Sequence, residues 1–425
     1  MNDKKTEDQA TKEVTVDFAS WRKRFAQVEE PYVSPTGAAI AAIVQKNDDN
    51  FGVCVNGEER GKAFEKVWHL RFSPDGRAVA LVMDDDEWTV AIDGEPWEET
   101  FEYVWNPLFS TDGKHIAVAA QNDSRYFMVL DGASWESEYY QISDMILSND
   151  GDKTAAVVQI KQLGQGEIVE FQEGVFSVAV NGETWERAFM GVWRPVFSLD
   201  GARVAATVRL NRLDYTIAVD GKCWENTFKC VWEPVFRPGS NTVSAPVMKN
   251  GKWYLFADDK DLWGKEFFQL WCPTYSANGA RLAAIVAPEY GKWTVAVDGE
   301  SWRIRFDEMV TDLVLSPDGG AHVAAVGKDS GKYFVVLDGA KQGGSFDMVW
   351  RPVFSPTGEH MVVKVEKDGK YGILFDGQMV EFGCDAVFNP VFNAGGEFLV
   401  LKYIKEGQYM RREVKLSELA GRVGE

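Results

Sequence analysis

The sequence predicts an all-β fold, and three observations support this prediction. A unit of about forty residues recurs about ten times along the chain, a period typical of repeated four-stranded sheets. The units carry turns built around glycine, of which the chain has 39. Aromatic residues make up 13% of the sequence, and they favour strands over long helices.

The first recurring element is a short turn that begins with Ser and ends with Gly. Complete copies are Ser34–Gly37, Ser73–Gly76, Ser110–Gly113, Ser148–Gly151, Ser198–Gly201, Ser276–Gly279, Ser316–Gly319 and Ser355–Gly358, and degenerate copies are Arg237–Gly239 and Asn393–Gly396. Pro presets φ at an early turn position, Asp or Asn bonds to nearby backbone, and Gly adopts a positive φ. Each copy therefore predicts a hairpin between two antiparallel strands.

The second recurring element is an Asn-Gly or Asp-Gly turn. An alternating apolar run, a polar loop and a second apolar run separate it from the first turn. Its copies are Asn56-Gly57, Asp93-Gly94, Asp131-Gly132, Asn181-Gly182, Asp220-Gly221, Asp298-Gly299, Asp338-Gly339 and Asp376-Gly377. Such dipeptides are strong hairpin signals. We expect the aspartates to bond to their own turn backbone.

The third element is a Trp-x-x-x-Phe block, which we interpret as a short fourth strand. Its fullest copies are Trp97–Phe101, Trp224–Phe228 and Trp302–Phe306. The tryptophans at this position are Trp21, Trp97, Trp135, Trp185, Trp224, Trp263 and Trp302. Large flat side chains are suited to filling the wedge between adjacent sheets, so we expect this outer set to be structural.

The fourth element is a Val-Trp-x-Pro block, found for example at Val104–Pro107 and Val192–Pro195. Because Pro cannot donate to a sheet ladder, this block is expected in the connection to the innermost strand or at its first residue. Its tryptophans, with related ones in less complete copies, are Trp68, Trp105, Trp193, Trp232, Trp271 and Trp350. They are our candidate partner-binding face, since aromatic residues near one mouth of a ring suit the core of an interface.

Together these elements predict a closed β-propeller of about ten four-stranded antiparallel blades. Residues 389–416 supply three strands of a last blade, and Trp21–Phe25 is expected to complete it as the fourth strand. One ring is favoured over two five-bladed rings, because no linker interrupts the repeat. The expected boundaries are a disordered tail at 1–17, a single propeller domain at 18–416 and a tail at 417–425.

Two segments depart from the repeat. An insertion around Gln162–Gly174 is expected to be a long loop, and Leu416–Val423 a short helix. The unit around Ser240–Asp261 is irregular. The insertion and the irregular unit are candidate contact surfaces, because they break the symmetry of the ring.

The charge and the termini restrict the partners and location that the sequence allows. The formal net charge is −20, which repels nucleic acids and anionic membrane surfaces. No signal peptide and no membrane span are expected, so the sequence favours a cytoplasmic protein. The five cysteines contain no Cys-x-x-Cys pair, and we expect reduced, mostly packed thiols.

The chain carries few candidate catalytic or metal-binding residues. His115, His322 and His360 lie near the end of the Ser-to-Gly turns, and we interpret them as polar residues of the strand edge. The acidic run Asp84–Glu87 is expected to be a solvated loop, since it lacks the spacing and the Gly of calcium loops. No phosphate loop, nucleophile elbow or zinc motif occurs, so no catalytic residue, metal or cofactor is predicted.

The Ser-Pro-Asp-Gly hairpins, each followed by an apolar strand and an Asp-Gly turn, resemble WD-repeat-like propeller modules of TolB-type proteins over nearly the whole chain. Within that group, the Asp-Gly-x-x-Trp-x-x-x-Phe and Val-Trp-x-Pro-Val-Phe-Ser units resemble the tryptophan-rich subunit of the transmembrane tetrahaem cytochrome c (Tmc) complex of sulfate-reducing bacteria. This resemblance implies a cofactor-free subunit on the cytoplasmic side. Its implied partners are an iron–sulfur subunit similar to heterodisulfide reductase and a membrane cytochrome b subunit. It supplies no catalytic residues.

Three functions remain open, ranked in this order. The first is a non-catalytic scaffold subunit of a membrane-associated electron-transfer complex. The second is a propeller that binds small molecules or glycans in equivalent pockets between blades. The third is a hydrolase or lyase whose site is dispersed over several blades. The scaffold ranks first because the residues repeated in every unit are structural ones.

Overall fold

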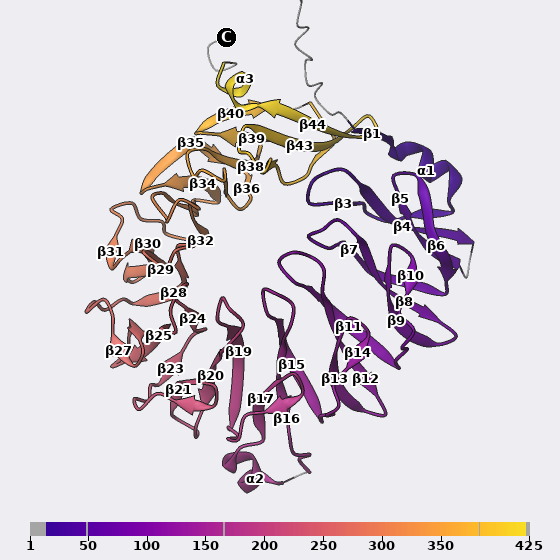
Figure 1. Ribbon diagram of the computed structural model, residues 1–425. Coiled ribbons are helices and arrows are strands. Elements are labelled where there is room, and N and C mark those ends of the chain that lie inside the picture. The colour runs from indigo at the N-terminus through magenta and orange to yellow at the C-terminus, as the bar shows by residue number, and fades with distance from the viewer. Residues whose placement is uncertain (1–13, 48–49, 165, 382, 422–425) are drawn as a thin grey trace, which may run out of the picture.

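The computed structural model describes residues 14–47, 50–164, 166–381 and 383–421. In these ranges the chain forms ten small antiparallel sheets arranged in a ring (Figure 1). Successive sheets follow the chain around the ring, so we number the blades 1 to 10 in that order. The prediction of a ten-bladed propeller is confirmed, as a single ring.

Each blade has four strand positions from the axis outwards. The innermost strands are β2 (Gln27–Val28) with β3 (Tyr32–Val33), β7 (Lys66–Phe72), β11 (Tyr103–Phe109), β15 (Gln141–Leu147), β19 (Gly191–Phe197), β23 (Cys230–Val231) with β24 (Val235–Phe236), β28 (Gln269–Tyr275), β32 (Met309–Leu315), β36 (Met348–Val349) with β37 (Val353–Phe354), and β41 (Ala386–Val387) with β42 (Val391–Phe392). The second strands are β4 (Ile40–Asn47), β8 (Ala78–Asp84), β12 (Ile116–Asn122), β16 (Thr154–Gln159), β20 (Val204–Arg209), β25 (Val243–Lys249), β29 (Leu282–Glu289), β33 (Val323–Asp329), β38 (Met361–Lys367) and β43 (Phe398–Lys405).

The two outer positions follow in the same order. The third strands are β5 (Asn50–Val55), β9 (Glu87–Ile92), β13 (Arg125–Leu130), β17 (Phe176–Val180), β21 (Tyr215–Val219), β26 (Lys252–Ala257), β30 (Lys292–Val297), β34 (Lys332–Leu337), β39 (Lys370–Phe375) and β44 (Gln408–Lys415). The outermost strands are β6 (Glu58–Phe64), β10 (Glu95–Pro96), β14 (Ala133–Ser134), β18 (Glu183–Thr184), β22 (Lys222–Cys223), β27 (Lys260–Asp261), β31 (Glu300–Ser301), β35 (Ala340–Phe346), β40 (Gln378–Glu381) and β1 (Val14–Asp17).

The second strands form the centre of the core. In β8, the side chains from Ala78 to Met83 are all buried, because the neighbouring blades cover both faces of the sheet. The apolar clusters join adjacent blades: Val79 of blade 2, for example, belongs to one cluster with Ile116 and Val118 of blade 3. The ring is therefore held together by packing of each blade on the next.

The Trp-x-x-x-Phe block is not the fourth strand that the sequence predicted. In blade 2 the paired outer residues are Glu95 and Pro96, just before the block. Within the block, the Trp97 amide donates to the Val90 carbonyl and Phe101 forms an isolated bridge to Trp88. Between these points the chain arches away from the ladder, and the side chain of Trp97 lies against Gly132 of blade 3. The block therefore acts as an interblade contact, as expected for the outer tryptophans.

The ring is closed by the N-terminal segment, but not by the residues that the sequence predicted. Strand β1 pairs antiparallel with β44 of blade 10, whereas Trp21 lies in helix α1 (Phe18–Arg24). Asp17 ends the strand and caps the helix, since its carboxylate accepts a hydrogen bond from the Ser20 amide. Trp21 still fills the usual wedge, because it lies against Gly57 of blade 1.

The ends of the domain also differ from the expected boundaries. Residues Val14–Asp17 belong to the last blade, so the propeller begins before residue 18. The remainder of the expected N-terminal tail, residues 1–13, lies outside the described residues. Helix α3 (Leu416–Gly421) confirms the expected C-terminal helix, and Leu419 packs into the core of blades 9 and 10. The insertion after β16 contains a short helix, α2 (Ile168–Glu173), rather than loop alone.

Candidate functional site

The Val-Trp-x-Pro blocks lie within the innermost strand position, not in the connection before it or at its first residue as expected: β11 and β19 contain the block, and in blades 6 and 9 it joins the two short strands of that position. Trp105 is the third residue of β11 and pairs with Ala119 of β12, and the register then shifts before Leu108. The intervening Asn106 has a φ of 57°, which marks a β-bulge. The proline that follows needs no ladder partner there, because a bulge leaves its extra residue unpaired.

The six candidate tryptophans therefore share one end of the ring. It is the end at which the innermost strands begin and at which hairpins join the second and third strands: Lys66 at the start of β7 pairs with Met83 near the end of β8. We call this end the tryptophan face. The Ser-to-Gly and Asp-Gly turns lie at the opposite end.

Five of the six tryptophans pack against an aromatic ring at the start of the third strand of the same blade. Trp232 stacks on Trp253 with ring centroids 5.4 Å apart, and Trp271 lies 4.4 Å from Trp293. The other three pairs are Trp105 with Tyr126, Trp193 with Tyr215, and Trp350 with Tyr371. Among the described residues, Trp68 is the member of the set without an aromatic ring contact.

The six tryptophans differ in exposure. Trp68 is 63% exposed, Trp193 40% and Trp232 39%, whereas Trp105, Trp271 and Trp350 are half-buried. Four blades carry another residue at this position: Glu29 in blade 1, Ser143 in blade 4, Thr311 in blade 8 and Phe388 in blade 10. The face is therefore not a uniform ring of indoles.

Charged bulge residues link neighbouring blades beside Trp193. The backbone amide of Arg194 donates to the Asp144 carboxylate of blade 4 at 3.2 Å, and its guanidinium lies 3.5 Å from Glu233 of blade 6. Although Cys272 is exposed, desolvation by the surrounding protein, followed by the charge of Glu233, raises the pKa of its thiol. This thiol is therefore protonated at neutral pH, and the surroundings of Trp193 and Trp232 combine aromatic surface with both signs of charge.

Three cavities open between blades on the tryptophan face. One of about 660 Å³ lies between blades 1 and 2 and is bordered by Trp68. A second, of about 320 Å³, lies between Trp193 and Trp232. The third, of about 440 Å³, is bordered by Trp271 and Thr311. Their linings differ, so they are not the equivalent pockets that repeated ligand binding would require.

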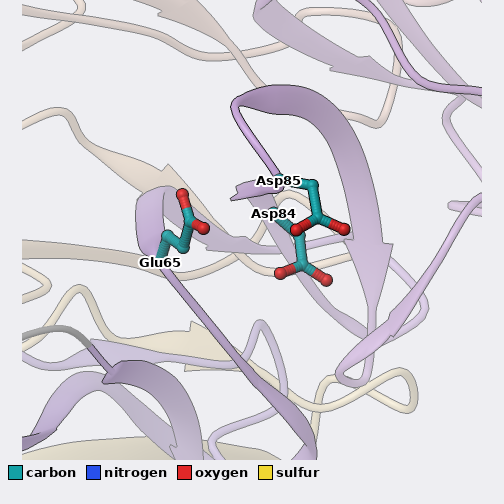
Figure 2. Close-up of side chains that lie close together, drawn as sticks. All are labelled: Glu65, Asp84 and Asp85. Carbon is teal, nitrogen blue, oxygen red and sulfur yellow. The ribbon is translucent and has the colours of Figure 1, made fainter.

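The acidic run Asp84–Glu87 forms the hairpin between β8 and β9, as expected. Figure 2 shows the carboxylates of Asp84 and Asp85 together with that of Glu65, which precedes β7. Oxygen atoms of the three lie within 4.8 Å of one another. The ammonium group of Lys62 lies 2.5 Å from Asp84 and already neutralises one of these charges. The arrangement is that of a solvated acidic surface.

The histidines at the opposite end are structural. The Nδ1 atoms of His115, His322 and His360 each lie 2.7 Å from the aspartate of the Asp-Gly turn in the same blade. Arg203 and Arg281 make the same contact in blades 5 and 7. The second carboxylate oxygen of each aspartate accepts a hydrogen bond from a backbone amide at the start of the second strand, such as that of Ile116. The aspartates were expected to bond to the backbone of their own turn instead.

No protein-family model matches the chain, and no curated protein matches it significantly. Solved structures with similar backbones include a eukaryotic initiation factor, at 14% identity and a TM-score of 0.48, covering 75% of this chain and 87% of that one. The Dos1 propeller aligns at 11% identity and a TM-score of 0.35, covering 91% and 92%. TolB from Acinetobacter baumannii aligns at 14% and 0.30, covering 57% and 61%. At these TM-scores the likenesses carry no argument about function.

None of the helices in the described ranges is long and apolar enough to cross a membrane.

Proposed function

We propose that this chain is a binding subunit that holds a protein partner against its tryptophan face. The observation that carries the proposal is the exposure of Trp68, Trp193 and Trp232 on one end of the ring. An exposed indole leaves a large apolar surface in water, and tryptophan is enriched among the residues that dominate binding energies at interfaces. The half-buried Trp105, Trp271 and Trp350 extend the same surface.

The charges on this face support a partner of mixed or basic surface. The chain carries a net charge of −20, while Arg194 places a cation between Asp144 and Glu233 beside the exposed tryptophans. Such a pattern orients a partner and accelerates its approach more than it strengthens the final complex. Added salt is therefore expected to slow association more than it accelerates dissociation.

We further propose, from the sequence resemblance alone, that the partner belongs to a membrane-associated electron-transfer complex. In this proposal the chain is a non-catalytic scaffold on the cytoplasmic side and brings no cofactor of its own. Its neighbours are a heterodisulfide reductase-like iron–sulfur subunit and a membrane cytochrome b subunit. The tryptophan face supplies the contact surface for one of them.

This proposal is tested by mild-detergent purification of the tagged protein from its native membranes, followed by mass spectrometry and a visible absorption spectrum. Haem-containing and iron–sulfur polypeptides are expected to co-purify in stoichiometric amounts. A colourless protein that purifies without a partner would refute the scaffold role. A stoichiometric partner without haem or clusters would retain the binding role and refute the redox complex.

A further inference from the structure

The cavity between blades 1 and 2 lies where a tryptophan of the repeat is replaced by a carboxylate. Residues Val28-Glu29-Glu30-Pro31 align with Val104-Trp105-Asn106-Pro107, so Glu29 occupies the tryptophan position of blade 1. In blade 3 the tryptophan at this position contacts the ring of Tyr126, and the equivalent third-strand residue of blade 1 is Phe51, which pairs with Gln45 as Tyr126 pairs with Gln121. Without an indole beside it, Phe51 borders a cavity of about 660 Å³.

The lining of this cavity combines aromatic rings with carboxylates. Phe51, Trp68 and Trp88 contribute rings, and Met83 contributes a thioether. The charged residues that line it are Glu29, Glu65 and Lys66. The carboxylates of Asp84 and Asp85 lie next to Glu65, with Lys62 paired to Asp84. The lining and its surroundings therefore carry a net negative charge.

Aromatic faces and carboxylates together bind organic cations. A weakly hydrated ammonium group is attracted to the electron-rich faces of indole and phenyl rings, and such aromatic sites recognise quaternary ammonium ligands. A bare metal ion would instead require several oxygen ligands in a fixed shell. The volume falls in the range of small-molecule sites and exceeds what one lysine side chain would fill.

We propose that this cavity binds a small organic cation with a trimethylammonium-type head group. The head group lies among Trp68, Trp88 and Phe51, and Glu29 and Glu65 balance its charge. This site is separate from the cavity bordered by Trp193 and Trp232, and it does not depend on the proposed protein partner. Glu29 breaks the symmetry of the repeat here, because it places a negative charge where most blades carry an indole.

The environment of Glu29 fits this role. Solvent reaches its side chain, yet desolvation by the surrounding protein raises the pKa of the carboxyl group. A bound cation would stabilise the ionised form and lower this pKa again. Binding is therefore expected to release protons at a pH near the pKa of Glu29.

The experiment is a calorimetric titration of the full chain with choline, compared with its neutral isostere 3,3-dimethyl-1-butanol. One choline site is expected, with affinity at least about tenfold above that of the neutral alcohol, since only the cation gains the ring and carboxylate attraction. Equal binding of the two probes, or no binding of choline, would overturn the proposal. So would displacement of choline by millimolar Ca²⁺, which would assign the site to a metal.

Matched variants locate the site. Trp68→Ala and Glu29→Gln are each expected to weaken choline binding roughly tenfold. Lys66→Gln is expected to strengthen it, because it removes the cation that lines the cavity. Glu30→Gln, at the next residue in blade 1, and Tyr290→Ala, which removes an exposed ring in blade 7, should leave affinity unchanged. Unchanged affinity in both Trp68→Ala and Glu29→Gln, with unaltered thermal unfolding, would contradict the location.

Discussion

At the scale of single residues, the closure of the ring depends on three side chains of blade 10 that bond to one turn of blade 1. The Nζ of Lys402 donates to the Pro35 carbonyl at 3.2 Å, the Nε of Arg411 to Thr36 at 2.9 Å, and the hydroxyl of Tyr409 to Gly37 at 2.6 Å. Three successive carbonyls of this Ser-to-Gly turn, near the N-terminus, thus accept hydrogen bonds from side chains near the C-terminus. These bonds supplement the pairing of β1 with β44.

Lys402 makes this closure dependent on pH. It is 5% exposed, and burial, followed by the charge of Arg411, lowers its pKa from 10.5 to about 8. Between these two values the unfolded chain binds more protons than the folded chain, so the free energy of unfolding rises with pH. We predict that the free energy of unfolding, measured by denaturant titration, increases between pH 8 and 9.5, and that this increase is absent in Lys402→Met. An equal increase in both proteins would contradict this assignment. Above pH 10 the raised pKa of buried Tyr409 acts in the opposite direction.

The glycines of several Asp-Gly turns lie in close contact with the outer tryptophans. At Gly339, φ is +79° and a Cβ atom would lie 3.2 Å from Trp302 of the preceding blade. Gly369 has a similar φ of +72°, but nothing lies within 4 Å of its Cβ position. We predict that Gly369→Ala lowers the free energy of unfolding by about 1 kcal/mol and Gly339→Ala by about 2–3 kcal/mol. If chemical denaturation gave the same loss of unfolding free energy for both variants, the contact with Trp302 would contribute nothing beyond the strain of the glycine backbone.

Exposure of individual tryptophans could not be predicted from the sequence. The repeat identified Trp68, Trp193 and Trp350 as equivalent, yet Trp193 and Trp350 each contact a tyrosine some twenty residues further along, while no such ring contact involves Trp68 among the described residues. The significance of Glu29 was missed as well. The signal was present, since aligning the Val-Trp-x-Pro blocks shows a carboxylate at a tryptophan position.

At the scale of elements, the turns were predictable and the edges of the blades were not. The Asp-Gly turns have positive φ at both residues, 50° at Asp93 and 86° at Gly94, a local requirement that the dipeptide itself reveals. The closing strand was misassigned because Trp21–Phe25 repeats the Trp-x-x-x-Phe pattern within a helix. The pattern indicates a tryptophan that packs on the next blade. Such a tryptophan can lie in a helix, as Trp21 does, or in an arched segment, as Trp97 does.

Strand β1 is the element whose removal tests closure. It pairs four residues, Val14–Asp17, with β44. We predict that deletion of residues 1–17 lowers the thermal unfolding midpoint by roughly 5–10 °C and promotes association, because it exposes an unpaired edge strand. Deletion of residues 1–13 keeps β1 and serves as the control. Equal midpoints for the two truncated proteins would show that β1 does not close the ring.

At the scale of the whole molecule, the ring presents two unlike ends. The end with the Ser-to-Gly and Asp-Gly turns carries repeated ion pairs between histidine or arginine and aspartate, which stabilise individual blades. The tryptophan face carries the exposed indoles, whereas cavities between blades occur at both ends. The repeated turns thus specify the fold and the repeated tryptophans form the proposed partner surface, whereas the proposed cation site depends on Glu29, which departs from the repeat.

In the proposed function, the tryptophan face holds the partner. Trp193→Ala combined with Trp232→Ala removes its exposed indoles beside Arg194, while Leu199→Ala removes a 59% exposed side chain at the opposite end of β19. The most direct measurement is the amount of partner retained by each tagged protein purified from native membranes, with thermal unfolding as the folding control. We predict at least about tenfold loss in the double variant and none in Leu199→Ala. Full retention by a folded double variant would place the partner elsewhere on the ring.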